Sequence, residues 1–141
     1  MFVSISKKHI NQMKKHLERE YPREAVGALI GNYVNEKMEI EEIIELKNET
    51  TENPAMRFFV SPESVYEIEM QCRTEGKEIV GWYHSHPNGS PDPSEEDLKN
   101  AFPFYAYFIV SVVRGQAKEI KCWRLNAASS QFEECALEIE D

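Results

Sequence analysis

Hydrophobic and polar residues alternate along the chain with two different periods, which predicts a protein that contains both helices and strands. In residues 6–21, apolar side chains recur three and seven positions after the first. This spacing predicts a helix with one buried stripe, formed by Ile10, Met13 and Leu17. The lysines between them, together with His9 and His16, are expected on the solvated face of this helix.

Short apolar runs bounded by polar or turn-forming residues predict a β-sheet. The expected strands are residues 3–5, 25–31, 38–46, 79–84, 105–113, 119–125 and 132–139, with extended structure also at 58–60. The glutamates of residues 38–46 favour a position at the edge of the sheet. Tight turns such as Arg114-Gly115 join several of these runs, so part of the sheet should be antiparallel.

Two further helices are expected to begin at serine residues. Ser61 followed by Pro62 is typical of a helix cap with proline at the first helical position, and Ser94 opens a short helix that reaches about Ala101. Helices interleaved with many strands indicate an α/β or α+β sandwich rather than an all-β barrel. The 141 residues contain no repeat and no linker, so we expect a single domain over residues 1–141.

The composition disfavours some classes of binding partner and favours one cellular compartment. With 25 acidic and 16 basic residues the formal net charge is −9, which disfavours nucleic acid and anionic membranes, because both bind concentrated basic surfaces. The cysteines Cys72, Cys122 and Cys135 form no Cys-x-x-Cys pair, which argues against a zinc ribbon and against a disulfide framework. The first residues carry no long apolar run, so we expect neither signal peptide nor membrane span, and a cytoplasmic protein.

The candidate chemistry lies in GWYHSHPNGSPDPSEEDLKN, residues 81–100. Residues i and i+2 of a strand point to the same face, so His84 and His86 can direct two imidazoles at one point. Neutral imidazole is among the commonest zinc ligands. The pair alone is weak evidence, since two histidines at a strand end can also simply be exposed. The following PNGSPDP cannot continue a strand, so the chain must turn back near the histidines.

The acids after this turn could supply a third ligand. Local reasoning does not choose among Asp92, Glu95, Glu96 and Asp97, and it leaves open that Ser94 and Asp97 only cap a helix. A set of two histidines and one carboxylate, with an open fourth position, is what a catalytic zinc site needs.

A hydrolytic zinc site also needs a group that accepts and delivers a proton. Glu24, which precedes the strand AVGALIG, is the candidate outside the cluster. The alternative is a surface glutamate at the start of a strand.

Taken together, these residues resemble the motif of the JAMM (MPN-plus) metalloprotease family. That motif is an upstream glutamate, then His-Ser/Thr-His, seven residues, Ser, two residues and Asp. The chain matches every position and spacing, with Glu24, His84-Ser85-His86, Ser94 and Asp97. The resemblance implies that His84, His86 and Asp97 bind Zn²⁺, that Glu24 is the general base and acid, and that Ser94 steadies the oxyanion.

The resemblance also implies a fold and a substrate. The expected fold is a cytidine deaminase-like sandwich, in which helices flank a mixed, largely antiparallel sheet. The expected activity is that of a small stand-alone prokaryotic-type peptidase or isopeptidase, which cleaves after the C-terminal tail of ubiquitin-like or sulfur-carrier proteins. The alternative is a non-catalytic MPN-type protein-interaction module. The Pro-Cys-x-x-Cys that accompanies His-x-Glu in zinc deaminases is absent, as is His-Glu-x-x-His, so neither deamination nor a thermolysin-like site is supported.

Overall fold

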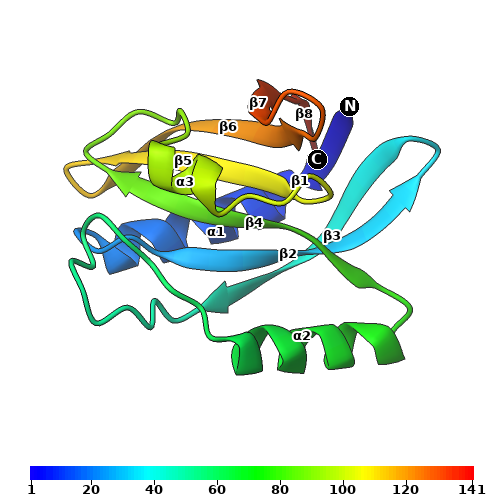
Figure 1. Cartoon of the computed structure of the whole chain (residues 1–141), viewed down its shortest axis with the longest axis horizontal. Coiled ribbons are helices and arrows are strands. Elements are labelled where there is room, and N and C mark those ends of the chain that lie inside the picture. Colours follow the sequence, from blue (N-terminus) through cyan, green and yellow to red (C-terminus); the bar gives the residue numbers. More distant parts are fainter.

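The computed structural model describes all 141 residues, in eight strands and three helices (Figure 1). In chain order they are β1 (Phe2–Ser6), α1 (Lys7–Glu20), β2 (Val26–Val34), β3 (Lys37–Leu46), α2 (Pro62–Thr74), β4 (Glu78–Pro87), α3 (Glu95–Lys99), β5 (Ala106–Val113), β6 (Gln116–Asn126), β7 (Gln131–Glu134) and β8 (Ala136–Glu140). None of the helices is long and apolar enough to cross a membrane. The serines expected to cap α2 and α3, Ser61 and Ser94, are their N-caps.

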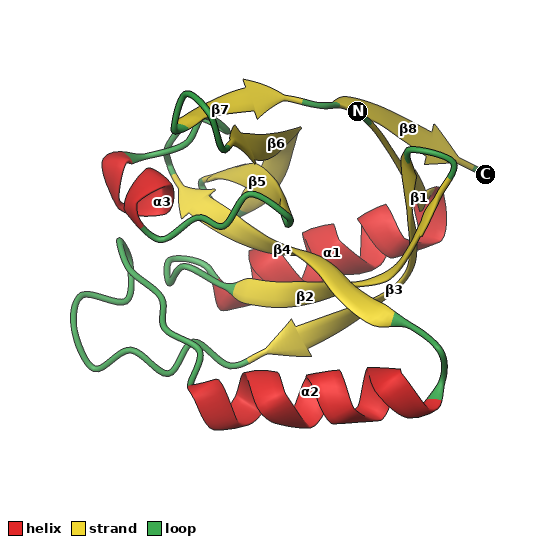
Figure 2. Cartoon of the chain, turned by 45° about the vertical axis from the view of Figure 1, so that its right-hand side comes forward, coloured by secondary structure: helices red, strands yellow, loops and turns green.

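All eight strands form one sheet, in the order β7-β6-β5-β4-β2-β3-β1-β8. Four neighbouring pairs are antiparallel, and the pairs β1–β3, β1–β8 and β4–β5 are parallel. The sheet curls strongly, with α1 on its inner side and α2 on its outer side (Figure 2). The prediction of a mixed, largely antiparallel sheet flanked by helices is therefore confirmed.

Two hydrophobic clusters hold the helices to the sheet. The stripe predicted for the first helix is buried, and it packs against residues of β1, β3, β4, β5 and β6. Burying a side chain of this size contributes about 1.5–3 kcal/mol each. On the outer side, Ile68 and Cys72 of α2 pack against Ala28, Ile30 and Ile79. The central strands β2 and β4 are covered on both faces, which fixes the end of β4 where the candidate chemistry lies.

Three details differ from the sequence predictions. Residues 132–139 form two strands rather than one, because the curl brings both sheet edges close together: β7 pairs with β6, β8 pairs with β1, and Cys135 lies between them. Residues 38–46 lie between β2 and β1 in the strand order rather than at an edge, but β1 pairs only with residues 37–39, so residues 40–46 have a strand neighbour on one side only. Residues 58–60 form no strand.

His16 is also placed differently from the prediction, since it is buried rather than solvated. Its Nδ1 lies 2.7 Å from the hydroxyl of Tyr83 in β4. A Cβ at Gly27 would lie 2.0 Å from the Tyr83 ring, so glycine is needed there for β2 to pass this side chain. The pair satisfies two polar groups inside the core, on the side of the sheet away from α2.

Candidate metal centre

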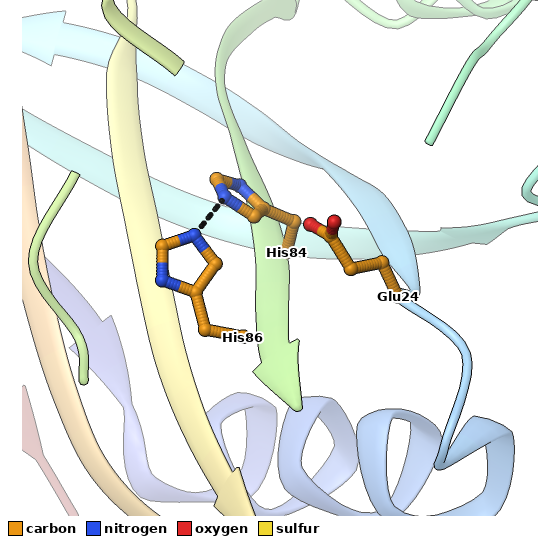
Figure 3. Close-up of side chains that lie close together, drawn as sticks. All are labelled: Glu24, His84 and His86. Atoms are coloured by element: carbon orange, nitrogen blue, oxygen red, sulfur yellow. Dashed lines mark hydrogen bonds between the residues drawn. The ribbon is translucent and has the colours of Figure 1, made fainter. Parts of the chain in front are cut away.

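The end of β4 presents the two histidines to the same side of the sheet, as their spacing predicts. The Nε2 atoms of His84 and His86 lie 3.2 Å apart (Figure 3). Ser85 between them points away and its hydroxyl accepts a hydrogen bond of 2.9 Å from the Ala25 amide. This bond fastens β4 to the start of β2, directly beside Glu24.

Asp97 is the acid that the structure brings to both histidines. Its Oδ1 lies 3.1 Å from Nε2 of His84 and its Oδ2 lies 3.0 Å from Nε2 of His86. Asp92 instead pairs with Lys121 at 3.2 Å, and the side chain of Glu95 is exposed. Among the four acids that local reasoning left open, only Asp97 reaches both imidazoles.

These three donors fit a small tetrahedral cation. Ligands about 2.0 Å from a tetrahedral ion lie ~3.3 Å from one another. The two Nε2 atoms lie 3.2 Å apart, and each lies 3.0–3.1 Å from one of the two Asp97 oxygens, Oδ1 for His84 and Oδ2 for His86. Two imidazoles and a carboxylate are also the ligand types that zinc accepts.

Asp97 is positioned by the first turn of α3. The Ser94 amide donates to Asp97 Oδ2 at 2.8 Å, and the Asp97 amide donates to the Ser94 hydroxyl at 3.1 Å, which together make a capping box. The cap and the candidate ligand are thus the same residues, and neither interpretation excludes the other. The cap holds the carboxylate in place against the histidines.

The turn after β4 is anchored from the neighbouring strands. The hydroxyl of Ser111 donates to the Gly89 carbonyl, and Trp123 Nε1 donates to the Pro91 carbonyl at 3.0 Å. These bonds fix the Ser90 carbonyl, which lies 2.8 Å from Nδ1 of His86. An outer partner of this kind orients the imidazole so that Nε2 faces Asp97. The pattern of the sequence did not indicate Ser111 or Trp123, because both lie on strands that are distant along the chain.

Glu24 lies between α1 and β2 and is only 6% exposed, so the alternative of a surface glutamate is wrong. Ligand atoms of Glu24, His84 and His86 all lie within 4.8 Å of one another (Figure 3). Burial raises the pKa of Glu24 to about 7; Asp97 and Glu96 add to the rise, and His86 opposes it. A carboxyl group that titrates near neutrality can both accept and release a proton.

The two carboxylates beside the histidines differ in protonation. Burial by itself would raise the pKa of Asp97, but hydrogen bonds from His84 and His86 outweigh it, and the net pKa lies well below the usual range. Asp97 is therefore ionised at neutral pH, as an anionic ligand must be, while Glu24 sits near its pKa. Carboxyl groups whose pKa values are pushed apart in this way suit different roles.

The raised pKa of Glu24 predicts a stability change for Glu24→Gln. The unfolded chain loses this proton near pH 4.5 and the folded chain near pH 7, so ionisation destabilises the fold progressively between these values and fully above them. With a chelator present at pH 8, Glu24→Gln should therefore be the more stable protein, by on the order of 3 kcal/mol at most. Urea unfolding at pH 5 and pH 8 measures this, with exposed Glu95→Gln as the control. Equal stability of wild type and Glu24→Gln at pH 8 would contradict the prediction.

The cluster lies in a cleft of roughly 940 Å³. One wall is the segment of residues 49–60 between β3 and α2, and Phe58 from this wall packs against the His84 imidazole with ring centres 4.9 Å apart. A second wall is aromatic, with Phe102, Tyr105, Tyr107 and Phe132. The cleft is large enough for an extended peptide segment, and its apolar walls were not foreseen from the sequence.

A buried glutamate, two imidazoles and an ionised carboxylate line this cleft together, and this set of side chains fits a metal-binding site. Residues 6–126 match the family described as prokaryotic homologs of the JAB domain. The chain belongs to this family. The resemblance drawn from the motif is confirmed by this match and by the solved structures below.

Curated relatives match parts of the chain. A protein of Thermus thermophilus, named a probable TtuB-protein conjugate cleaving protease, is 32% identical over 92 residues, which are 65% of this chain and 58% of the relative. A protein of Haloferax volcanii named desampylase is 37% identical over 59 residues, which are 41% of this chain and 42% of the relative. The chain thus spans less than two thirds of the length of these relatives.

Solved structures match the whole chain. The solution structure of a protein from Desulfitobacterium hafniense aligns with a TM-score of 0.85 at 25% identity, covering 100% of this chain and 94% of the other. The crystal structure of a JAB1/MPN domain protein from Archaeoglobus fulgidus aligns with a TM-score of 0.62 at 25% identity, covering 100% of both chains. The fold of this chain is therefore a JAB/MPN fold.

Proposed function

We propose that this chain is a zinc-dependent peptidase or isopeptidase that cleaves after the C-terminal tail of ubiquitin-like or sulfur-carrier proteins. The observation that carries the proposal is the convergence of four side chains at the base of the cleft. Glu24, His84 and His86 bring their ligand atoms within 4.8 Å of one another, and Asp97 reaches both imidazoles. In this proposal residues 1–141 act as one catalytic domain.

His84, His86 and Asp97 would hold the metal. Zinc bound there would lower the pKa of a water molecule to about 7. Glu24 would accept the proton released from that water and later deliver it to the leaving nitrogen, which a carboxyl group with a pKa of about 7 can do. The aromatic wall and residues 49–60 would hold the extended tail and limit the access of bulk water to the cluster.

Ser94 would donate a hydrogen bond to the oxyanion. Its oxygen accepts from the Asp97 amide, while its hydroxyl hydrogen has no acceptor in the protein. Because the side chain lines the cleft, that hydrogen is free to be donated to the substrate.

We expect Ser94→Ala to lower kcat by about 10²–10³ without loss of the metal, the usual effect of removing one oxyanion donor. The substitution also removes the helix cap, so matched variants separate the two effects. Ser94→Thr keeps both the helix cap and the hydroxyl donor, so its kcat should stay near the wild-type value. Ser94→Asp keeps the cap but cannot donate a hydrogen bond when ionised, so its kcat should be as low as that of Ser94→Ala. Steady-state rates at saturating zinc measure this. Wild-type kcat in Ser94→Asp would exclude the donor role.

The substrate class rests on two supports. The names of two relatives refer to cleaving TtuB-protein conjugates and to desampylation, and a human relative, 29% identical over 97 residues that are 11% of its length, is named a deubiquitinase. The cleft, of roughly 940 Å³, has room for a flexible tail.

The experiment that tests the proposal uses a ubiquitin-like protein that ends in Gly-Gly and is extended by a short peptide. The zinc-loaded chain should release a product whose new C-terminus is the second glycine, identified by intact mass. A fusion in which Gly-Gly is replaced by Val-Val should not be cut, because side chains at these positions would widen the tail in the cleft. A chain that is folded and loaded with zinc but cuts neither fusion would contradict the proposal and favour a non-catalytic interaction module.

A further inference from the structure

We propose that Asn48 is a positioning residue, whose buried side chain fixes the backbone of Glu24 and the 49–60 wall of the cleft in one geometry. The inference deepens the proposed function and rests on it, because it concerns the residue assigned there as the base. Asn48 follows β3 and is 5% exposed.

The carboxamide of Asn48 uses its full hydrogen-bonding capacity. Its Nδ2 donates to the Glu24 carbonyl at 2.8 Å and to the Arg57 carbonyl at 2.9 Å. Its Oδ1 accepts from the amides of Thr50 and Phe59, each at 3.1 Å. Of the side chains that are this short, only a carboxamide offers two donors and two acceptor positions in one plane.

Asn48 forms hydrogen bonds with the backbone on both sides of Phe58. The Arg57 carbonyl precedes this residue and the Phe59 amide follows it, and Phe58 packs against the imidazole of His84. Residues 49–60 contain no helix or strand, so their shape depends on such side-chain bonds together with a few backbone bonds, among them the bond of 2.8 Å from the Glu49 amide to the Phe59 carbonyl. Asn48 therefore controls a contact to a candidate metal ligand as well as the wall itself.

The side chain of Glu24 depends on its backbone for its position. Its carboxylate accepts no hydrogen bond from the protein, whereas its amide donates to the Pro54 carbonyl at 2.6 Å and its carbonyl accepts from Asn48. Asn48 is thus an anchor common to the wall that would hold the substrate tail and the base that would act on it, in addition to the direct bond between Glu24 and Pro54. A displacement of about 1 Å at a reacting group can cost 10²-fold in rate, so this anchor bears on catalysis.

The variants that test the inference are Asn48→Ala and the milder Asn48→Ser, with Asn126→Ala as the matched control. Asn126 also holds a turn through its side chain, which accepts from the amides of Ala128 and Ser129, but it is the last residue of β6 and does not line the cleft. The rates of cleavage of the Gly-Gly fusion are measured at saturating zinc and expressed per bound metal.

Both Asn48 variants should keep one zinc per chain and show a lower kcat, by ~10²-fold for Asn48→Ala and less for Asn48→Ser, together with a raised KM because the wall loosens. Asn126→Ala should change neither constant. A role limited to fold stability would reduce the melting temperature and the folded fraction, yet leave kcat and KM per bound metal at wild-type values. That outcome in Asn48→Ser, the variant more certain to fold, would overturn the inference.

A second readout does not depend on activity. The backbone carbonyl ¹³C chemical shift of Glu24 reports the hydrogen bond from Asn48. Hydrogen exchange at the Thr50 and Phe59 amides reports how stable their hydrogen bonds to Asn48 are. Both should change in Asn48→Ser and not in Asn126→Ala; unchanged values in Asn48→Ser would overturn the inference even if no substrate is ever cut.

If Glu24→Gln cleaves at the wild-type rate, the proposed base is wrong. If Glu24→Gln is inactive and the Asn48 variants match wild type, only the positioning role fails.

Discussion

Glu24→Gln should lower kcat by about 10²–10⁴, the usual contribution of a general acid–base group, while the chain still binds one zinc. The amide keeps the size and the backbone anchors of the glutamate but cannot accept the proton. Only its contact with the histidine cluster changes, so binding of the tail and KM should change little. Initial rates on the Gly-Gly fusion, with metal content determined on the same samples, measure the effect.

The pH dependence of the wild type checks the same assignment. Glu24 must be ionised to accept a proton, so kcat/KM should rise with pH as the carboxyl group loses its proton. Its pKa is about 7 because of burial, and a bound cation nearby would lower it, so the rising limb should lie at or below about pH 7. Glu95→Gln, an exposed position in the same region, is the control and should leave rate and profile unchanged. A Glu24→Gln protein that cleaves as fast as wild type would contradict the assignment.

Asp97→Ala should weaken zinc binding by more than the ~10–100-fold expected for loss of an outer partner, because it removes one of three ligands. The remaining imidazoles of His84 and His86 would bind the ion with two donors only. Competition with a chelating dye gives the affinity. Asp92→Ala is the matched control, since Asp92 is a nearby acid that pairs with Lys121 and should leave the affinity unchanged.

The same titration decides between the two carboxylates beside the histidines. Glu24 and Asp97 lie near the same imidazoles, and Asp97 is assigned as the ligand because its oxygens are 3.0–3.1 Å from both Nε2 atoms. Wild-type affinity in Asp97→Ala, with a loss in Glu24→Gln, would reverse the assignment. The loss of the capping box in Asp97→Ala would destabilise α3 by ~1 kcal/mol, which unfolding curves can separate from the loss of metal binding.

Much of the site followed from local rules. The i, i+2 spacing predicted that His84 and His86 face the same side, and their nitrogens lie 3.2 Å apart. Residues Ser94 and Asp97 were predicted as a cap, and they form one. These features could be predicted because they depend on a few neighbouring residues and on the geometry of one element.

Other features depend on contacts that are distant along the chain. Local reasoning could not choose Asp97 among four acids, because the path of the turn after β4 is set by Ser111 and Trp123 from β5 and β6. Local reasoning left open that Glu24 is a surface residue, because the bonds that its backbone makes with Asn48 and Pro54 come from a segment more than 20 residues away. His16 was misplaced for the same reason, since its partner Tyr83 lies 67 residues away.

The most direct test of the account is the rate at which the protein cleaves the Gly-Gly fusion after its metal has been removed with a chelator, and again after one equivalent of zinc has been restored. We expect no cleavage in the stripped protein and full recovery at one zinc per chain, with no recovery in Asp97→Ala at that zinc concentration. Cleavage at the same rate in the stripped and restored protein would contradict it.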